Sequence, residues 1–191
     1  ASIMNLVFQL KKELFWIHNF LPPQLYKDMY VEAIKKRNHS NYKPTDVCWP
    51  TYKEEFDNMS YSYNQKSNLN AEDKFFTKYH IILKHQKFLN LINKQLNSHL
   101  RKYTYGQHLT WHKDHYKNRT YAATFYFNRT WNENWGGEFM FKTNTSSGFF
   151  PIVGNSLIIA KGGLVHKVNS NLKKTHPRLS IQTWISDKDE K

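Results

Sequence analysis

From Leu100 almost to the end of the chain, apolar and polar residues alternate with a period of two in short runs. Alternation of this kind is typical of β-strands that have one buried face. Eight such runs in one stretch predict a double-stranded β-helix, the jelly-roll fold, over about residues 100–186. Clusters of Asn, Gly or Ser separate the runs, which fall near residues 100–105, 108–114, 120–128, 137–142, 147–153, 155–160, 165–169 and 178–186.

The first half of the chain has a different pattern, with apolar residues at helical spacing. Pro22-Pro23 predicts the start of a helix over about 23–37, because proline is tolerated in a first helical turn. A cap-like Asn70 with acidic residues behind it predicts a second, long helix over about 72–98. We expect a short strand near Leu14–Ile17, and between the helices, over 38–70, a loop with a short strand near Val47–Tyr52. Residues 1–99 are therefore expected to support the jelly roll, in one domain of 191 residues.

One pair in the strand region has the spacing of metal ligands. Side chains at positions i and i+2 of a strand leave the same face, so His112 and Asp114 can hold one ion together. A second imidazole from a distant strand, His166, would complete two histidines and one carboxylate, the set typical of non-haem Fe(II) oxygenases. The pair alone is weak evidence, because this composition gives about one such pair by chance.

An ordered series of motifs surrounds these three residues. His112-x-Asp114 is followed by Tyr126-Phe127-Asn128, then Gly136-Gly137-Glu138, then His166, and Arg178 comes twelve residues later. In this order the chain resembles the prolyl 4-hydroxylase-like branch of the 2-oxoglutarate- and Fe(II)-dependent dioxygenases. The resemblance covers about residues 100–186, and residues 15–22 are similar to the opening strand of that family.

The resemblance implies both cofactors and site residues. Fe(II) would be held by His112, Asp114 and His166, which would also be the catalytic centre. Arg178 would pair with the distal carboxylate of 2-oxoglutarate, since guanidinium binds carboxylate in a fixed bidentate geometry, and Tyr126 would hydrogen-bond the same group. Dioxygen would be the other cosubstrate, and ascorbate an accessory reductant. Some relatives have a lysine in place of Arg178.

Further site roles stay open. Either Tyr103 or Tyr105 stands at the distance of another tyrosine that contacts the cosubstrate. His108, His115 and His176 are spare imidazoles, and His115 is a candidate for substrate contact. Gly136-Gly137 is expected in a tight turn, and Trp184 in packing on the last strand.

The implied reaction is hydroxylation with release of succinate and carbon dioxide, and Asp114 supports it because halogenating relatives leave that position to halide. The first substrate hypothesis is a prolyl or other residue of a peptide or protein, with region 38–70 as a substrate lid. A nucleic-acid demethylase is the second, although those relatives have a further arginine where this chain ends its motif in Trp184. A small-molecule hydroxylase is the third hypothesis, and a non-catalytic metal-binding jelly roll is the fourth.

Composition bears on partners and location. A net charge of +13 is compatible with an acidic partner such as nucleic acid, but we favour its explanation by the Lys- and Asn-rich composition of an AT-rich genome. The single cysteine, Cys48, suits a reducing compartment, and no apolar run has the length of a membrane span. We therefore expect a cytoplasmic protein without a membrane partner, whose oligomeric state the sequence does not define.

Overall fold

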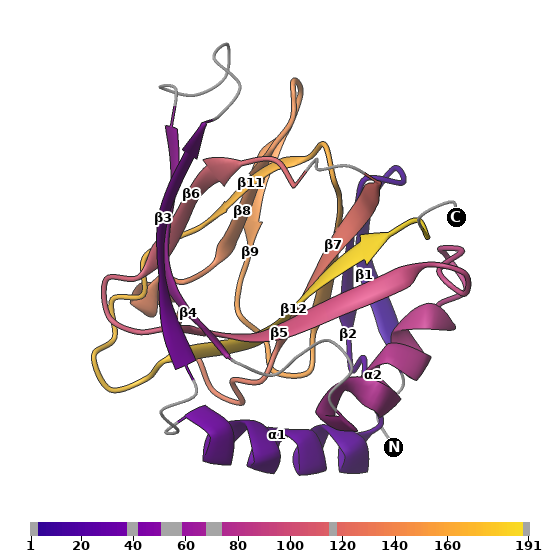
Figure 1. Ribbon diagram of the computed structural model, residues 1–191, viewed down its shortest axis with the longest axis horizontal. Helices are drawn as coiled ribbons and strands as arrows, with labels where there is room; N and C mark the ends of the chain where they lie inside the picture. Colours follow the sequence, from indigo (N-terminus) through magenta and orange to yellow (C-terminus); the bar gives the residue numbers. More distant parts are fainter. Residues whose placement is uncertain (1–3, 38–41, 51–58, 68–73, 115–117, 189–191) are drawn as a thin grey trace.

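A computed structural model describes residues 4–37, 42–50, 59–67, 74–114 and 118–188, and for 42–50 and 59–67 it describes the backbone alone. Two α-helices and one 3₁₀ turn accompany the strands of this described part (Figure 1). The elements in chain order are β1 Asn5–Leu10, β2 Leu14–His18, α1 Pro23–Arg37, β3 Tyr42–Pro50, β4 Met59–Ser67, α2 Lys74–Lys84, β5 Gln95–Tyr103, β6 His108–His112, β7 Arg119–Tyr126, η1 Glu133–Trp135, β8 Phe139–Lys142, β9 Ser147–Phe150, β10 Leu157–Lys161, β11 Val165–Val168 and β12 Arg178–Ser186.

The strands form the two antiparallel sheets of a jelly roll, as predicted. The large sheet has the order β1-β2-β10-β7-β12-β5, and the small sheet has the order β6-β11-β8-β9. Strand β4 hydrogen-bonds to β5 through Gln65 and Lys66 and to β6 through Ser62 and Tyr63, so it connects the two sheets. Strand β3 pairs only with β4 in this arrangement of the described strands. The hairpin β3-β4 therefore lies directly beside β6, the strand on which His112 lies.

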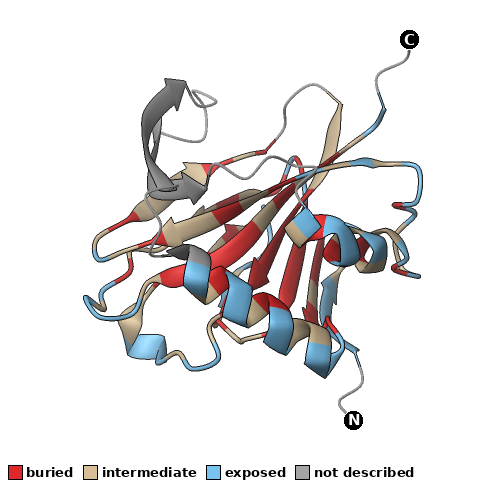
Figure 2. Cartoon of the chain, turned by 60° about the horizontal axis from the view of Figure 1, so that its bottom comes forward, coloured by how far each residue is buried: buried red, intermediate tan, exposed pale blue. Residues whose placement is uncertain are grey.

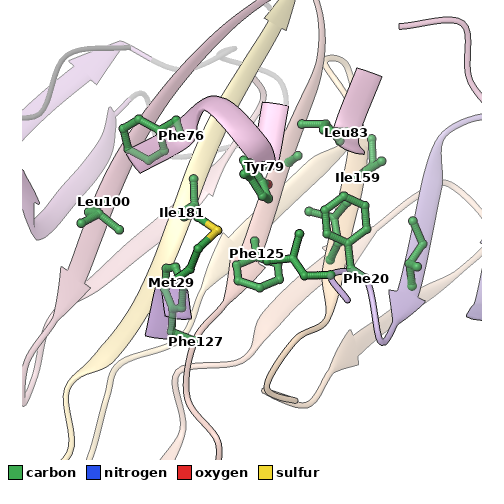
Figure 3. Close-up of a cluster of buried hydrophobic side chains, with 14 of the residues drawn as sticks. Phe20, Met29, Phe76, Tyr79, Leu83, Leu100, Phe125, Phe127, Ile159 and Ile181 are labelled. Atoms are coloured by element: carbon green, nitrogen blue, oxygen red, sulfur yellow. The ribbon is translucent and has the colours of Figure 1, made fainter. Parts of the chain in front are cut away.

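The main hydrophobic core lies between the helices and the large sheet. Alternate residues of the strands, such as Phe125 on β7 and Ile181 on β12, point towards Met29 of α1 and Tyr79 of α2 (Figure 3). The outer sides of both helices are exposed, whereas the strands behind them are mostly buried (Figure 2). A second apolar cluster includes Tyr126 of β7 and Phe139 of β8, and thus joins the inner faces of the two sheets.

The helix over 23–37 and the strand near 14–17 are confirmed, and each of the eight strands predicted beyond residue 100 has a counterpart among β5 to β12. The long helix over 72–98 is wrong. Helix α2 ends at Lys84, and β5 begins at Gln95. Strand β5 pairs with β12 over nine consecutive positions. This long-range ladder outweighs a helical spacing of apolar residues that a twisted strand and a turn can also produce. The predicted cap at Asn70 lies outside the described residues.

Two strands had no sequence prediction. Strand β1 is exposed along most of its length, so it lacks the alternation that marks a half-buried strand. In the region 38–70, the predicted short strand near 47–52 belongs to a longer strand, β3, and β4 follows it. The sequence of β4, MSYSYNQKS, is rich in small polar residues that are uncommon in strands. No helix of the described residues is long and apolar enough to cross a membrane.

Candidate metal and cosubstrate site

The structure brings His112, Asp114 and His166 together. His112 ends β6 and is paired in register with His166 of β11, and their ring centroids are 4.2 Å apart. Asp114 follows two residues after His112, just beyond the strand, and all three side chains are buried. One ligand atom from each residue lies within 4.8 Å of the others. The pairing of β6 with β11 thus brings together two histidines that are far apart in the sequence.

A hydrogen bond to a backbone carbonyl oxygen fixes the orientation of each imidazole. Nδ1 of His112 donates to the carbonyl oxygen of Thr110 at 2.7 Å, and Nδ1 of His166 donates to that of Leu164 at 2.8 Å. With the proton held at Nδ1, the neutral ring presents the lone pair of Nε2. Both Nε2 atoms face Asp114, at 3.5 Å from Oδ1 for His112 and 3.0 Å from Oδ2 for His166. A preorganised pair of nitrogen ligands is the result.

The electrostatics of the cluster favour a charged carboxylate. Burial alone would raise the pKa of Asp114, but the two imidazoles hold this pKa well below its usual range. Burial lowers the pKa of His166, and Asp114 outweighs it, so the net shift is upward. Oδ2 of Asp114 is buried and makes no well-directed hydrogen bond among the described residues. Two aligned nitrogen atoms and a buried carboxylate oxygen that lacks a hydrogen bond fit a divalent iron ion.

Beside the triad lies a buried cation, Arg178, at the start of β12. Its side chain is 1% exposed and it is the largest fully buried residue of the described part. Its guanidinium donates to the hydroxyl of Tyr126 at 3.1 Å and to Ser180 Oγ at 3.4 Å. Nε is buried without a hydrogen-bond partner, and no carboxylate of the described residues forms an ion pair with it.

A buried guanidinium without a counter-ion is costly unless an anion accompanies it. The rings of Tyr103 and Tyr126 flank it, with centroids 4.7 and 4.9 Å from Cζ. Burial raises the pKa of both tyrosines, and the charge of Arg178 opposes that shift. Both hydroxyls are therefore protonated at neutral pH and can donate to an anion. The unused Nε and the aromatic walls fit a carboxylate such as the distal one of 2-oxoglutarate.

The structure distinguishes between the two candidate tyrosines. Tyr103 is buried against Arg178, whose Cζ lies 4.7 Å from its ring centroid, and the charge of Asp114 also acts on its pKa. Tyr105 is 54% exposed, and Lys174 lies over its ring. Tyr103 is thus the tyrosine of the site.

Steric constraints explain why the predicted turn has glycine at two successive positions. Gly136 and Gly137 have φ values of 70° and 76°, which side chains rarely adopt. A Cβ on Gly136 would lie 2.2 Å from the carbonyl oxygen of Ser170, and one on Gly137 would lie 3.4 Å from Cδ of Arg178. The turn therefore lets the chain pass close behind the guanidinium.

Sequence reasoning assigned no role to Ser180 or Arg101, although strand parity offered a signal for both. Ser180 is two residues after Arg178 on β12, and Arg101 is two residues before Tyr103 on β5, so each shares the inner face of its strand. Burial lowers the pKa of Arg101, and the nearby Tyr103 and Asp114 oppose that shift. Arg101 thus adds a second cation near the triad.

The remaining predicted residues lie around this centre. Trp184 is at the far end of β12, where the guanidinium of Arg119 stacks 3.9 Å over its ring. His108 contacts the carbonyl oxygen of Gly106, and His176 is exposed and contacts Thr175, so neither joins the triad. His115 lies outside the described residues.

Comparisons with known proteins identify a family model and solved structures that this chain is similar to. Residues 98–186 match the model of the 2OG-Fe(II) oxygenase superfamily. A prolyl 4-hydroxylase of Pseudomonas putida aligns with 92% of this chain and 93% of its own, at a TM-score of 0.70 and 16% identity. A prolyl hydroxylase of Trichoplax adhaerens was solved in complex with a peptide fragment of the hypoxia-inducible factor oxygen degradation domain. It aligns with 93% of this chain and 84% of its own, at a TM-score of 0.71 and 12% identity.

A third similar structure is that of an epimerase. The non-haem, α-ketoglutarate-dependent epimerase SnoN of nogalamycin biosynthesis aligns with 92% of this chain and 78% of its own, at a TM-score of 0.66 and 10% identity. At these identities the likeness establishes the fold. No curated protein matches the chain.

Proposed function

Residues 98–186, which contain the whole site, belong to the 2OG-Fe(II) oxygenase superfamily, and on that basis we propose that this 2-oxoglutarate-dependent dioxygenase hydroxylates a residue of a peptide or protein. The single observation that carries the proposal is the buried Arg178, which has no carboxylate partner among the described residues, beside a buried triad of two histidines and one carboxylate. A metal-binding module without a cosubstrate would gain nothing from such a guanidinium. We further propose that residues 1–191 act as one catalytic unit in the cytoplasm.

Each residue would have a defined task. His112, Asp114 and His166 would hold Fe(II), and Arg178 would bind and orient the distal carboxylate of 2-oxoglutarate with help from Tyr126 and Ser180. Bound iron with its cosubstrate supplies dioxygen activation. The balanced reaction is substrate C–H plus 2-oxoglutarate plus dioxygen, giving substrate C–OH, succinate and carbon dioxide.

The walls of the site would exclude water from this chemistry. Phe139 stacks on the His166 ring with centroids 5.1 Å apart, and it shares an apolar cluster with Tyr126. A dry site strengthens the pairing of Arg178 with a carboxylate, because charges interact more strongly at low dielectric. Orientation of the reactants and exclusion of water are thus the contributions of the protein itself.

A peptide substrate has two supports. The solved Trichoplax relative is named for its complex with a peptide fragment. In this chain the hairpin β3-β4 pairs directly with β6, so its backbone adds a wall next to the strand of His112. We propose that this hairpin contacts the substrate.

Succinate formation tests the proposal. Fe(II)-loaded protein would be given 2-oxoglutarate and air, with and without proline-rich peptides, against a His112→Ala, Asp114→Ala control. Peptide-stimulated turnover that the control lacks would support a prolyl-type hydroxylase. Slow turnover with every peptide would direct the search to methylated nucleic acid or small molecules. Absence of both turnover and 2-oxoglutarate binding would contradict the oxygenase function. Parallel assays with and without ascorbate would test its role as a reductant.

A further inference from the structure

The outer face of the small sheet has a composition that the oxygenase function does not require. In β6, β11, β8 and β9 the inward side chains, such as His112, Phe139 and Phe150, are buried. The alternate side chains face outward. Register places Phe149 of β9 opposite Met140 of β8, and Met140 opposite Lys167 of β11. An aromatic ring, a thioether and an ammonium therefore form one row across three strands.

Two cations converge on this face. Lys142 of β8 and Lys167 of β11 both lie over the indole of Trp111 on β6, with Nζ atoms 4.7 and 5.3 Å from the ring centroid. The ring attracts each ammonium, while the two like charges repel each other. Trp111 thus holds two lysines of neighbouring strands in one place.

The charged residues within these four strands have the same sign. None of these four strands contains an acidic residue, and residues 139–186 include six Lys and Arg but no Asp or Glu. Both helices pack on the other sheet, on the opposite side of the molecule (Figure 1). Phe149 is 52% exposed, which is unusual for a phenylalanine on a strand whose other face is buried. The face therefore combines fixed cations with an exposed ring.

We propose that this outer face binds single-stranded nucleic acid. Lys142 and Lys167 pair with successive phosphates, Trp111 positions them, and Phe149 stacks on an unpaired base. Positively charged tracks with stacking aromatic rings are the general means of binding single strands. A duplex presents no free base to the ring, and an acidic peptide would use the lysines without it. The proposal is independent of the oxygenase site, which lies on the inner face of the same strands.

Fluorescence anisotropy with a labelled oligothymidylate of about twelve nucleotides tests this proposal on the whole chain at low salt. The double variant Lys142→Ala, Lys167→Ala should weaken binding about tenfold or more. The slope of log binding constant against log salt concentration should become less steep by about 1.4, since each phosphate contact in a single strand contributes about 0.7 to that slope. The matched control is Lys74→Ala with Lys78→Ala, which removes the same charge from exposed positions of α2. Its affinity should change less than about twofold.

A second variant separates stacking from charge. Phe149→Leu keeps apolar volume but removes the ring, and it should weaken binding about fivefold or more without altering the salt dependence. Circular dichroism would verify that both variants fold. The proposal is overturned if the wild-type chain does not bind, if the α2 control loses as much affinity, if duplex binds as tightly, or if polyglutamate competes equally well. Mn(II) binding by the triad would be measured separately, so failure of this proposal leaves the oxygenase function standing.

Discussion

Replacement of Arg178 by methionine tests the central feature of the site. Methionine has a similar length but no charge. The guanidinium is 1% exposed and has no acidic partner among the described residues, so without an anion its burial is a cost. The variant loses the contacts with Tyr126 and Ser180 and gains apolar burial. These effects offset each other, and we expect the free energy of unfolding without ligand to change by no more than about 1 kcal/mol.

Binding of 2-oxoglutarate should respond very differently. Loss of one partner of a buried charge pair costs about 2–5 kcal/mol, which is roughly a 30-fold to 4,000-fold weaker affinity. In the wild-type chain, ligand at a hundred times its dissociation constant adds about 2.7 kcal/mol of stability. For a chain of this size that raises the melting temperature by about 5–10 °C. At the same concentration the variant should show a rise below about 1 °C if its affinity falls a thousandfold.

Thermal unfolding with Mn(II), with and without 2-oxoglutarate, measures both quantities in one experiment. Arg178→Lys is the control that retains charge but loses the planar fork, and its ligand-induced shift should be intermediate. If Arg178 were a structural residue, Arg178→Met would melt far lower without ligand, and its ligand-induced shift would equal that of the wild type. That pair of results would refute the assignment.

Four more tests, which use six substitutions, address particular residues. Tyr103→Leu should raise the KM for 2-oxoglutarate about threefold or more, because its ring lies 4.7 Å from the Arg178 guanidinium, whereas Tyr105→Leu should leave that KM unchanged; equal effects would contradict the choice between them. Gly137→Ala should lower the free energy of unfolding by roughly 1–3 kcal/mol in denaturant titration because of its φ of 76°, and Gly163→Ala, which has open space around it, should not. His166→Ala should lose Mn(II) affinity in calorimetry at least about tenfold, since it removes one of three ligands; unchanged affinity would place the metal elsewhere. Burial, with the charge of Lys84, lowers the pKa of His80 to about 4, so its neutral form is favoured in the folded state and stability should fall as pH drops from about 6.5 towards 4, by about 1–2 kcal/mol after solvent screening; His80→Gln should have a flatter profile.

The candidate metal site was open to prediction because its three residues have distinctive chemistry. Two imidazoles and a carboxylate at strand spacing suffice to propose the triad, and the order of motifs around them separates it from chance pairs. The sequence could not decide between Tyr103 and Tyr105, because Tyr103 ends β5 and Tyr105 follows only two residues later, and only the three-dimensional structure shows which one is buried. Ser180 was missed because a serine on a strand is not distinctive by itself, although its place two residues after the predicted Arg178 puts it on the same face.

The main error in the fold has a similar origin. Leu96 and Leu100 fit a helix that continues from Phe88 and equally a strand that begins at Gln95, and local spacing cannot decide between the two. The decision comes from β12, which is about eighty residues away in the sequence and pairs with β5 from Gln95 to Tyr103. Such non-local pairing lies outside any window of sequence.

The pairing of β12 with β5 also explains how helices α1 and α2 affect the candidate site. On β12, Leu179 and Ile181 face the core under the helices, whereas Arg178 and Ser180 face the site. A slip of one residue would exchange the two sets and bury the guanidinium among Met29 and Phe125. The apolar side of each strand thus fixes the register of its polar side. Substitutions under α1 and α2 should therefore affect 2-oxoglutarate binding only through global stability, whereas substitutions on the opposite face of the same strands should change affinity at constant stability.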